Sequence, residues 1–357
     1  MKTKISLFII GISVLFQYCS SKETAALVTN TGPNETNTNS NTAQAPSLPA
    51  TPYSYANVGL PSHIATALAQ QDNTPVDNPV TDHGATLGRV LFYDVKLSKT
   101  NTISCSSCHQ PSLSFSDSAV KSKGFAGGST ARHSMSLLNL RFYKSGKMFW
   151  DERAASLEQQ VLMPIQDMTE MGLTLDELQQ KVAAQTYYPA LFQNAFGTTQ
   201  VTSDRIAKAL AQFLRSIITT QSKYDQVKQG QAQFTPDEAV GENLFLNAGN
   251  ITCASCHAPP MFITSSPAAP FGLADPTDQG INGTRAFKSG SLRNVANTAP
   301  YFHNGSISSL QNMLAGANNP IPQHTVAPQD RQRLLAFMQT LSDVTSIQQE
   351  KFANPFK

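Results

Sequence analysis

The pattern of apolar and polar positions along the chain predicts helices that are separated by long loops. In several segments the apolar side chains recur at every third or fourth position, which is the spacing of one helix face. Three such faces are formed by Leu87, Val90 and Leu91, by Ile206, Leu210, Phe213, Leu214 and Ile217, and by Leu334, Leu335, Met338 and Leu341, which mark a last helix. No run of alternating strands appears, so the predicted fold class is mainly α with loops rich in Pro and Gly.

Two helix starts can be located from the sequence. Thr174 and Glu177 have the spacing of a capping box, in which the two side chains satisfy free N–H groups of the first turn. The run Thr235-Pro236-Asp237-Glu238 combines a cap, a first-turn proline and a capping glutamate. We therefore expect helices to begin directly after Thr174 and after Thr235.

Residues 1–19 have the features of a secretory signal. Two lysines precede an apolar stretch between Ile5 and Tyr18, which is too short to span a bilayer, and Cys19 follows. The tract resembles a bacterial lipoprotein signal, in which a cysteine at this place is acylated. Simple cleavage without a lipid is the alternative. Both predict a periplasmic protein, which the lipid would anchor to the membrane.

Residues 20–55 are predicted to form a disordered tether. The part from 22 to 52 is rich in Thr, Asn, Ser, Ala and Pro, has no aromatic residue and carries only three charges. Such a stretch cannot bury enough apolar surface to offset its ordering entropy.

A seven-residue pattern occurs twice in the remaining chain. The segments 103–109 and 251–257 read Ile-Ser-Cys-Ser-Ser-Cys-His and Ile-Thr-Cys-Ala-Ser-Cys-His. Each copy follows a helical stretch with Leu-Phe, and each is followed by Pro and Phe. The repeat predicts two related domains, residues 56–225 and 226–357.

Each copy contains Cys-x-x-Cys-His, the attachment signature of c-type haem. The thiols predicted to bind the haem vinyl groups are Cys105 and Cys108 in the first motif and Cys253 and Cys256 in the second. The predicted proximal iron ligands are His109 and His257. A zinc site and a redox disulfide are the alternatives. Neither needs a histidine directly after both cysteine pairs, so the prediction is two covalently attached haems.

Composition and charge exclude other classes. The 26 Lys and Arg residues nearly balance 24 Asp and Glu residues, which gives a net charge of +2 and argues against nucleic acid as a partner. Hydrophobic residues make up 40% of the chain and charged residues only 14%. This composition fits a globular core with a largely uncharged polar surface.

The sequence resembles the bacterial di-haem cytochrome c peroxidase family, which also includes the oxidases that mature methylamine dehydrogenase. The resemblance covers roughly residues 80–345. Besides the two haem motifs it rests on the segments 87–94, 149–172, 292–295 and 298–305.

The resemblance implies that Gln160, Pro164 and Glu170 line a peroxide pocket at the first haem and that Trp150, the single tryptophan, lies between the haems. Cleaving the O–O bond needs a proton moved from one oxygen to the other, and Glu170 is the candidate acid–base. Gln160 can donate a hydrogen bond without titrating, and Pro164 is expected to end a helix. Without the resemblance, Glu170 would be interpreted as a solvated loop carboxylate and Trp150 as a core residue.

The chain departs from the family in the loop after the first motif. Many members carry a histidine there that closes the first haem until the second is reduced. Residues 110–132 contain no histidine, and the nearest family position falls at about Phe125. We therefore expect an open or weakly held sixth site, active without prior reduction, with His133 as the alternative ligand. The resemblance also implies one calcium ion near His133, which stands at the place of a calcium-binding asparagine, with backbone carbonyls from Thr298 and Pro300. An imidazole is a poor calcium ligand, which argues against this ion.

The far ligand of the second haem is a methionine or a tyrosine in the family, and that position is Ala317 here. Met313 lies one helical turn earlier and is the predicted ligand, which would raise the reduction potential. His324 and Met261 are further alternatives, whereas Met338 belongs to an apolar stripe.

These features predict a periplasmic di-haem peroxidase that reduces hydrogen peroxide to water at the haem of His109. Electrons enter at the haem of His257 from a small cytochrome c or copper protein and pass Trp150. One alternative is a di-haem oxidase that modifies a partner protein. Such oxidases use a tyrosine at the second haem, and no tyrosine follows Tyr301 here. The other alternative is a non-enzymatic electron carrier. Family members are often dimers, so we expect a homodimer.

Overall fold

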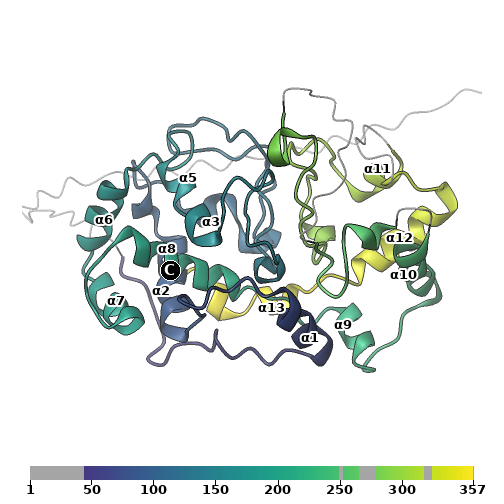
Figure 1. The fold of residues 1–357 in the computed structure, drawn as a ribbon, viewed down its shortest axis with the longest axis horizontal. Helices are drawn as coiled ribbons and strands as arrows, with labels where there is room; N and C mark the ends of the chain where they lie inside the picture. Colours follow the sequence, from purple (N-terminus) through teal and green to yellow (C-terminus); the bar gives the residue numbers. More distant parts are fainter. Residues whose placement is uncertain (1–43, 249–251, 265–277, 317–323, 357) are drawn as a thin grey trace, which may run out of the picture. The chain divides into compact units, whose positions relative to one another are not determined.

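The computed structural model describes residues 44–248, 252–264, 278–316 and 324–356. Helices joined by long loops make up this part of the chain (Figure 1). The extended pairings within the described ranges are isolated bridges between single residues. The predicted mainly α fold class is therefore confirmed. The predicted signal with Cys19 and residues 20–43 of the predicted tether lie outside the described residues.

The helix before the first haem motif packs closely against a helix from later in the chain. Helix α2 (Asp82–Tyr93) packs along α8 (Ser203–Arg215), which buries the predicted apolar face of α8. At the crossing, a Cβ atom on Gly88 would lie 2.0 Å from the carbonyl oxygen of Ala209. Only a glycine permits so close an approach of the two backbones.

The helix before the second haem motif has an equivalent partner. Helix α10 (Pro236–Asn247) packs along α12 (Pro328–Gln339), and a Cβ atom on Gly241 would lie 2.1 Å from the carbonyl oxygen of Arg333. The predicted capping box at Thr235 opens α10. The internal repeat therefore extends from the cysteine motifs to the helices in front of them.

Shorter elements complete the described chain. The remaining helices are α1 (Ser62–Gln71), α3 (Cys105–Cys108), α4 (Leu157–Gln160), α5 (Met163–Gln166), α6 (Leu175–Ala183), α7 (Tyr188–Phe196), α9 (Lys223–Lys228), α11 (Leu310–Leu314) and α13 (Val344–Ile347). The 3-10 turns are η1 (Val95–Leu97), η2 (Pro111–Leu113), η3 (Leu140–Phe142), η4 (Cys253–Ser255), η5 (Ile281–Gly283), η6 (Val295–Asn297) and η8 (Glu350–Phe352). The predicted capping box of Thr174 and Glu177 opens α6.

The repeat continues in the loops that follow each motif. Asn139 and Asn294 both adopt a left-handed backbone with φ of 60°, and each precedes a 3-10 turn. Each copy then forms a loop closed by one isolated bridge, between Met148 and Ala154 and between Tyr301 and Ile307. Trp150 and His303 each lie two residues after the first partner of the bridge. They therefore hold the same place in the two copies.

The carboxyl end of the described chain packs on the first half. Ile347 of α13 and Phe352 of η8 belong to the apolar core around α2. The hydroxyl of Tyr93 in α2 donates a hydrogen bond of 2.5 Å to the carbonyl oxygen of Phe352. The domain division between residues 225 and 226 stays a prediction, and this carboxyl end is a part of the second segment that packs with the first.

Residues 44–55 belong to the folded body, in contrast to the predicted tether. Tyr55 is 1% exposed, and its N–H donates a hydrogen bond of 2.7 Å to Oδ1 of Asp82. Its hydroxyl donates one of 2.6 Å to the carbonyl oxygen of Lys351. Tyr53 packs against the same core. These two aromatic residues supply the apolar surface that residues 22–52 lack, so the folded body includes the last part of the stretch that composition assigned to the tether.

A buried ion pair connects α9 to the loop beside the second motif. The Arg293 and Asp225 side chains are fully buried, and Nη1 and Nη2 each donate a hydrogen bond of 2.7 Å to one carboxylate oxygen. Burial alone would raise the pKa of Asp225, but the guanidinium lowers it overall. Arg293 also donates to the carbonyl oxygen of Pro260, which is the third residue after His257. Such a two-pronged pair fixes the orientation of both segments.

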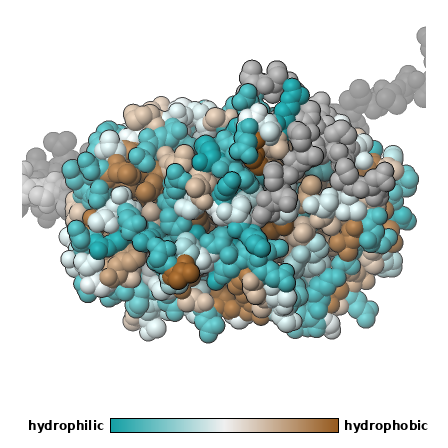
Figure 2. Space-filling view, in the orientation of Figure 1, coloured by the Kyte–Doolittle hydropathy of each residue, from teal (hydrophilic) through white to brown (hydrophobic). Residues whose placement is uncertain are grey.

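The surface is mostly hydrophilic on the face shown in Figure 2, with hydrophobic residues in small separate patches. This agrees with the polar, weakly charged surface expected from composition. Among the described residues, no helix is both long enough and apolar enough to cross a membrane.

Candidate haem sites

The first cavity brings together the residues of the first haem motif and three predicted pocket residues. Cys105, Cys108 and His109 line it together with Gln160, Pro164 and Glu170. An adjoining cavity of about 670 Å³ shares His109, Gln160, Pro164 and Glu170 and is also lined by Trp150. Residues that are separated in the sequence by up to 65 positions, from Cys105 to Glu170, therefore face one space.

His109 is oriented as a proximal haem ligand. Its Nδ1 atom is 3.1 Å from the carbonyl oxygen of Phe115, which fixes the N–H on that side of the ring. Burial lowers the pKa of His109 to about 4, so the imidazole is neutral and its other nitrogen can bind a metal. Phe115 has a positive φ of 57°, a conformation that turns its carbonyl toward the imidazole.

The cysteines of the first motif lie on a short helix. Helix α3 presents Cys105 and Cys108 on one turn, which Ser104 and Ser107 cap. Burial raises the pKa of Cys105 to about 12 and that of Cys108 to about 11, so neither is a reactive thiolate. None of the four described cysteines forms a disulfide. Within the described ranges, no group of three or more His, Cys, Asp or Glu side chains could hold a zinc ion.

Glu170 lies on a turn that the backbone holds against the first cavity. Its N–H donates to the carbonyl oxygen of Asp167 at 3.0 Å, and its carbonyl accepts from the N–H of Phe125 at 2.9 Å. Burial and then the Asp167 carboxylate raise the pKa of Glu170, while Arg153 acts in the opposite direction. A raised pKa lets a carboxyl group hold a proton more readily, which suits a group that must accept a proton and return it.

Pro164 differs from its predicted place in the secondary structure. Helix α4 already ends at Gln160, and Pro164 is the second residue of α5 rather than the end of a helix. The missing N–H of proline is tolerated in a first helical turn, where it has no partner in any case. The carbonyl oxygen of Pro164 accepts a hydrogen bond of 3.2 Å from the N–H of Met171. Pro164 thereby connects α5 to the turn that carries Glu170.

Trp150 lines both the adjoining cavity of His109 and the cavity of His257. Its indole N–H donates a hydrogen bond of 2.8 Å to the carbonyl oxygen of His133, and its own carbonyl accepts one of 2.8 Å from the N–H of Lys288. The indole meets the ring of His303 edge-on, with centroids 6.4 Å apart. These contacts hold the indole between the two halves of the repeat.

His133 is 4% exposed and also borders both cavities. Its Nδ1 atom is 3.0 Å from the carbonyl oxygen of Ala119, and its N–H donates to the carbonyl oxygen of His303 at 2.8 Å. Phe125, near the position at which the family resemblance predicts a closing histidine, packs its ring against Gly172. Whether His133 binds the first iron stays a prediction.

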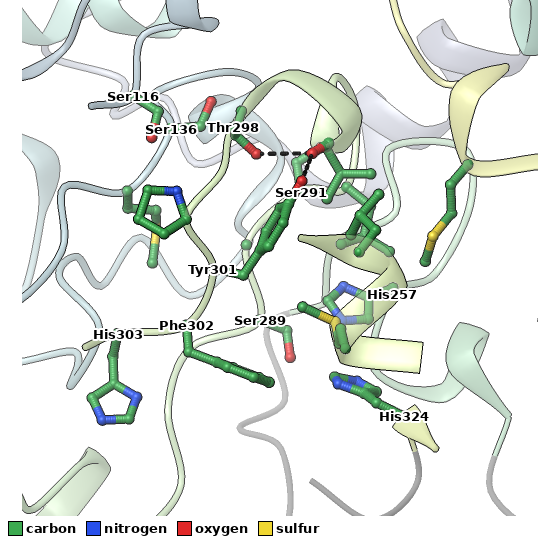
Figure 3. A pocket seen from close by; sticks show the side chains of 18 of the residues that line it. Ser116, Ser136, His257, Ser289, Ser291, Thr298, Tyr301, Phe302, His303 and His324 are labelled. Carbon is green, nitrogen blue, oxygen red and sulfur yellow. Dashed lines mark hydrogen bonds between the residues drawn. The ribbon is translucent and has the colours of Figure 1, made fainter. Parts of the chain in front are cut away.

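The second cavity is lined by Cys253 and His257 (Figure 3). Cys256 is not among its lining residues. Burial lowers the pKa of His257 to about 4, against smaller opposing effects of the backbone at Phe262 and Gly290. A neutral imidazole beside two thiols and a cavity of about 190 Å³ has the donors that a c-type haem requires.

Several predicted far-side residues of the second haem also line this cavity. Met313 of α11, Met338 of α12 and His324 all border it. Met261 instead belongs to a separate apolar cluster and does not line the cavity. Ala317, the family position, lies outside the described residues.

A charged network beside Trp150 was not predicted. Arg132 forms ion pairs of 2.7 Å with Asp151 and 2.8 Å with Asp278, and Nε2 of His303 is 2.9 Å from Asp278. The ring of Phe287 stacks on His303 with centroids 3.8 Å apart. These residues are far apart in the sequence, and no local pattern marks them as partners.

Lys288 is a second residue that sequence reasoning missed. Its side chain is buried, and Nζ donates to the carbonyl oxygen of Lys147 at 3.0 Å and lies 3.6 Å from the ring centroid of Tyr143. Burial lowers its pKa to about 7, against a smaller opposing effect of Glu152. In the sequence, Lys288 is indistinguishable from a surface lysine.

The fold and the two sites define a di-haem protein of the c type, with one motif beneath each cavity. Residues 82–233 match the family model described as di-haem cytochrome c peroxidase. The chain is 33% identical to the methylamine utilization protein MauG of Methylorubrum extorquens, over 75% of this chain and 80% of that protein. It is 30% identical to the cytochrome c551 peroxidase of Nitrosomonas europaea, over 81% of this chain and 90% of that protein.

A solved structure shows the same architecture. A MauG-like protein associated with microbial copper homeostasis superposes with a TM-score of 0.73 at 29% identity, covering 84% of this chain and 99% of that one. The chain belongs to the di-haem cytochrome c peroxidase family, as the motifs predicted.

Proposed function

We propose that the protein is a peroxidase that reduces hydrogen peroxide to two molecules of water, with two electrons from a donor protein and two protons. The observation that carries this proposal is the placement of Glu170, Gln160 and Pro164 around the cavity of His109, while Trp150 borders this space and the cavity of His257. When bound, each haem supplies an iron that exchanges electrons.

The side chains of the first cavity supply the proton chemistry. The raised pKa of Glu170 allows its carboxylate to take a proton from one peroxide oxygen and to return it to the other, which leaves as water. Gln160 donates a hydrogen bond that orients peroxide without competing for the proton. Pro164 excludes water from one wall of the site and holds the Glu170 turn through its carbonyl oxygen.

An open first site is supported by the loop after the motif. Phe125 offers only an apolar ring near the family position of the closing histidine, and its N–H holds the Glu170 turn. The Nδ1 atom of His133 is engaged with the carbonyl oxygen of Ala119. We therefore propose that peroxide can react at the first haem without prior reduction of the second.

Electrons enter at the second haem, held by Cys253, Cys256 and His257, and pass Trp150. The proposed donor is a small cytochrome c or copper protein. With a net charge of +2, electrostatic steering of this donor should be weak and local. Met313, which lines the second cavity, is the far ligand that the sequence predicts, and His324 competes with it there.

A di-haem oxidase that modifies a partner protein is the second candidate. It is favoured by the 33% identity to a methylamine utilization protein MauG and by the MauG-like solved structure. The absence of any tyrosine after Tyr301 in the sequence argues against it, if such oxidases need tyrosine at the second haem. A pure electron carrier would have no use for a carboxyl group of raised pKa in the first cavity.

Periplasmic location, a lipid on Cys19, a homodimer and a calcium ion near His133 stay predictions. Labelling with a radioactive fatty acid tests the lipid, and the mass of the holoprotein in solution tests the dimer. Thr298 and Pro300 border the second cavity together with His133, the place at which calcium was expected.

The proposed activity is tested with the holoprotein. A pyridine haemochrome assay should find two haems per chain, and each peroxide consumed should oxidise two molecules of a reduced one-electron donor. Peroxide loss without donor oxidation, or no peroxide loss with two haems present, would contradict the proposal.

A further inference from the structure

His324 stands out in the second cavity because one buried nitrogen of its ring is unsatisfied within the described chain. Its buried Nδ1 atom has no hydrogen-bond partner among the described residues. His324 borders the cavity that His257 also lines, and Figure 3 shows both imidazoles in the same part of it. The two rings also interact electrostatically. A buried nitrogen without a partner is costly in a folded protein, unless another group satisfies it.

The internal repeat assigns His324 to the far wall of the second cavity. Gln160 and Met171 lie ten and twenty-one residues after Trp150, and both line the first cavity on the side that carries Glu170. Met313 and His324 lie ten and twenty-one residues after His303, the counterpart of Trp150, and both line the second cavity. The two walls therefore correspond, and the second wall carries two side chains of the types that bind haem iron.

Met313 and His324 differ in what explains their positions. Met313 belongs to the apolar cluster formed by α11 and α12, so hydrophobic packing accounts for its burial. His324 does not belong to that cluster. The ring of Phe302 stacks on it with an interplanar angle of 11° and centroids 6.0 Å apart, which orients the imidazole but satisfies neither nitrogen.

We propose that His324 is the axial ligand opposite His257, so that the second haem is ligated by two histidines. This inference rests on the second haem of the proposed function. Imidazole is a common iron ligand in its neutral form. Two histidines, in place of a methionine and a histidine, remove the ligand that would raise the potential of this haem. The second haem then gives up electrons to the first more readily.

The ligand set can be measured on the unmodified holoprotein. Ferric haem with a methionine ligand has a weak far-red charge-transfer absorption, and bis-histidine haem lacks it. We expect the oxidised wild type to show one low-spin haem without this band and with the near-infrared magnetic circular dichroism of two imidazole ligands. A methionine band in the wild type would overturn the proposal and would support Met313 instead.

Two matched variants test the same point from the residue side. His324→Ala should convert the low-spin haem to a form that binds cyanide or added imidazole, while Met313→Leu should leave that spectrum unchanged. A pyridine haemochrome assay confirms that each variant holds two haems; if His324→Ala does not, the wild-type spectrum decides. An unchanged spectrum in His324→Ala, or loss of the low-spin form in Met313→Leu, would overturn the inference. Peroxide turnover reports separately on the proposed function, because a wild type with bis-histidine spectra and no turnover contradicts only the latter.

Discussion

The indole N–H of Trp150 donates a hydrogen bond of 2.8 Å to the carbonyl oxygen of His133, and both residues border the cavities of both haem motifs. The bond fixes the plane of an easily oxidised aromatic ring between two redox sites. The position of Trp150 therefore follows from two chain segments, its own loop and the segment that contains His133.

We expect Trp150→Phe to slow electron transfer between the haems by an order of magnitude or more. Phenylalanine keeps an aromatic ring against His303 but is harder to oxidise and leaves the His133 carbonyl without a donor, at a cost of about 1 kcal/mol. Stopped-flow reduction by a small donor, followed at each haem, measures the rate. Phe287→Leu removes a ring from the same region without touching the indole, and equal slowing in both variants would contradict a specific role of Trp150.

Glu170→Gln should reduce peroxide turnover by at least ~100-fold, because glutamine cannot carry the proton between the two peroxide oxygens. The haem spectra should stay nearly unchanged, since the substitution preserves shape. Met168→Gln is the control, because Met168 is exposed on the same turn. Near-normal turnover in Glu170→Gln would remove this residue from the mechanism.

The same carboxyl group predicts the acid limb of the pH profile. Glu170 must be ionised to accept a proton, so turnover should fall as the pH drops through its raised pKa. Asp167→Asn removes the negative charge that contributes to this pKa after burial. The acid limb should then move to lower pH. An unmoved limb in steady-state assays would show that another group titrates.

Lys288→Met is expected to stabilise the protein near neutral pH. Burial lowers the pKa of Lys288 from 10.5 to about 7, so the folded state disfavours the cation that the unfolded chain retains. The destabilisation is complete below pH 7 and shrinks as the pH rises toward 10.5. One pKa unit corresponds to about 1.4 kcal/mol. Removing the charge should therefore raise the unfolding temperature at pH 7 and flatten its pH dependence above that value.

Thermal unfolding between pH 6 and 10 measures this effect, with Lys147→Met as the exposed control. A lower unfolding temperature for Lys288→Met at pH 7 would show that the contacts of the ammonium with Tyr143 and the Lys147 carbonyl outweigh its burial.

The close backbone contacts of Gly88 and Gly241 predict that a substitution at each glycine destabilises only its own helix pair. In Gly88→Ala the new Cβ would meet the Ala209 carbonyl, and in Gly241→Ala the Arg333 carbonyl, so each change should force one helix pair apart. Each should cost at least ~1–3 kcal/mol, as overpacking does. Gly59→Ala is the control, because nothing lies within 4 Å of its Cβ position.

We expect Gly88→Ala to disturb the spectrum of the first haem and Gly241→Ala that of the second, as unfolding curves followed at each haem would show. Equal effects of both variants on both haems would argue against two domains divided near residue 225.

The sequence predicted those features of the structure that depend on residues close together in the chain. The cysteine motifs, the capping boxes of Thr174 and Thr235 and the apolar face of α8 were all identifiable from the sequence, because each depends on residues within a few turns. The gathering of Gln160, Pro164 and Glu170 around one cavity could be expected only through the family resemblance.

Long-range packing decided the rest. Tyr55 is buried through contacts with Asp82 and Lys351, although the sequence around it is that of a tether. Lys288 has a perturbed pKa because segments from both halves enclose it. No pattern within a short window reports such partners.

The central claim is that the first haem has a free face toward Glu170. Stopped-flow mixing of the fully oxidised holoprotein and of its half-reduced form with hydrogen peroxide tests it most directly. We expect a rapid change in the spectrum of one haem in the oxidised protein, lost in Glu170→Gln, and full turnover once donor is added. No reaction of the oxidised protein, with reaction only after half-reduction or not at all, would contradict it.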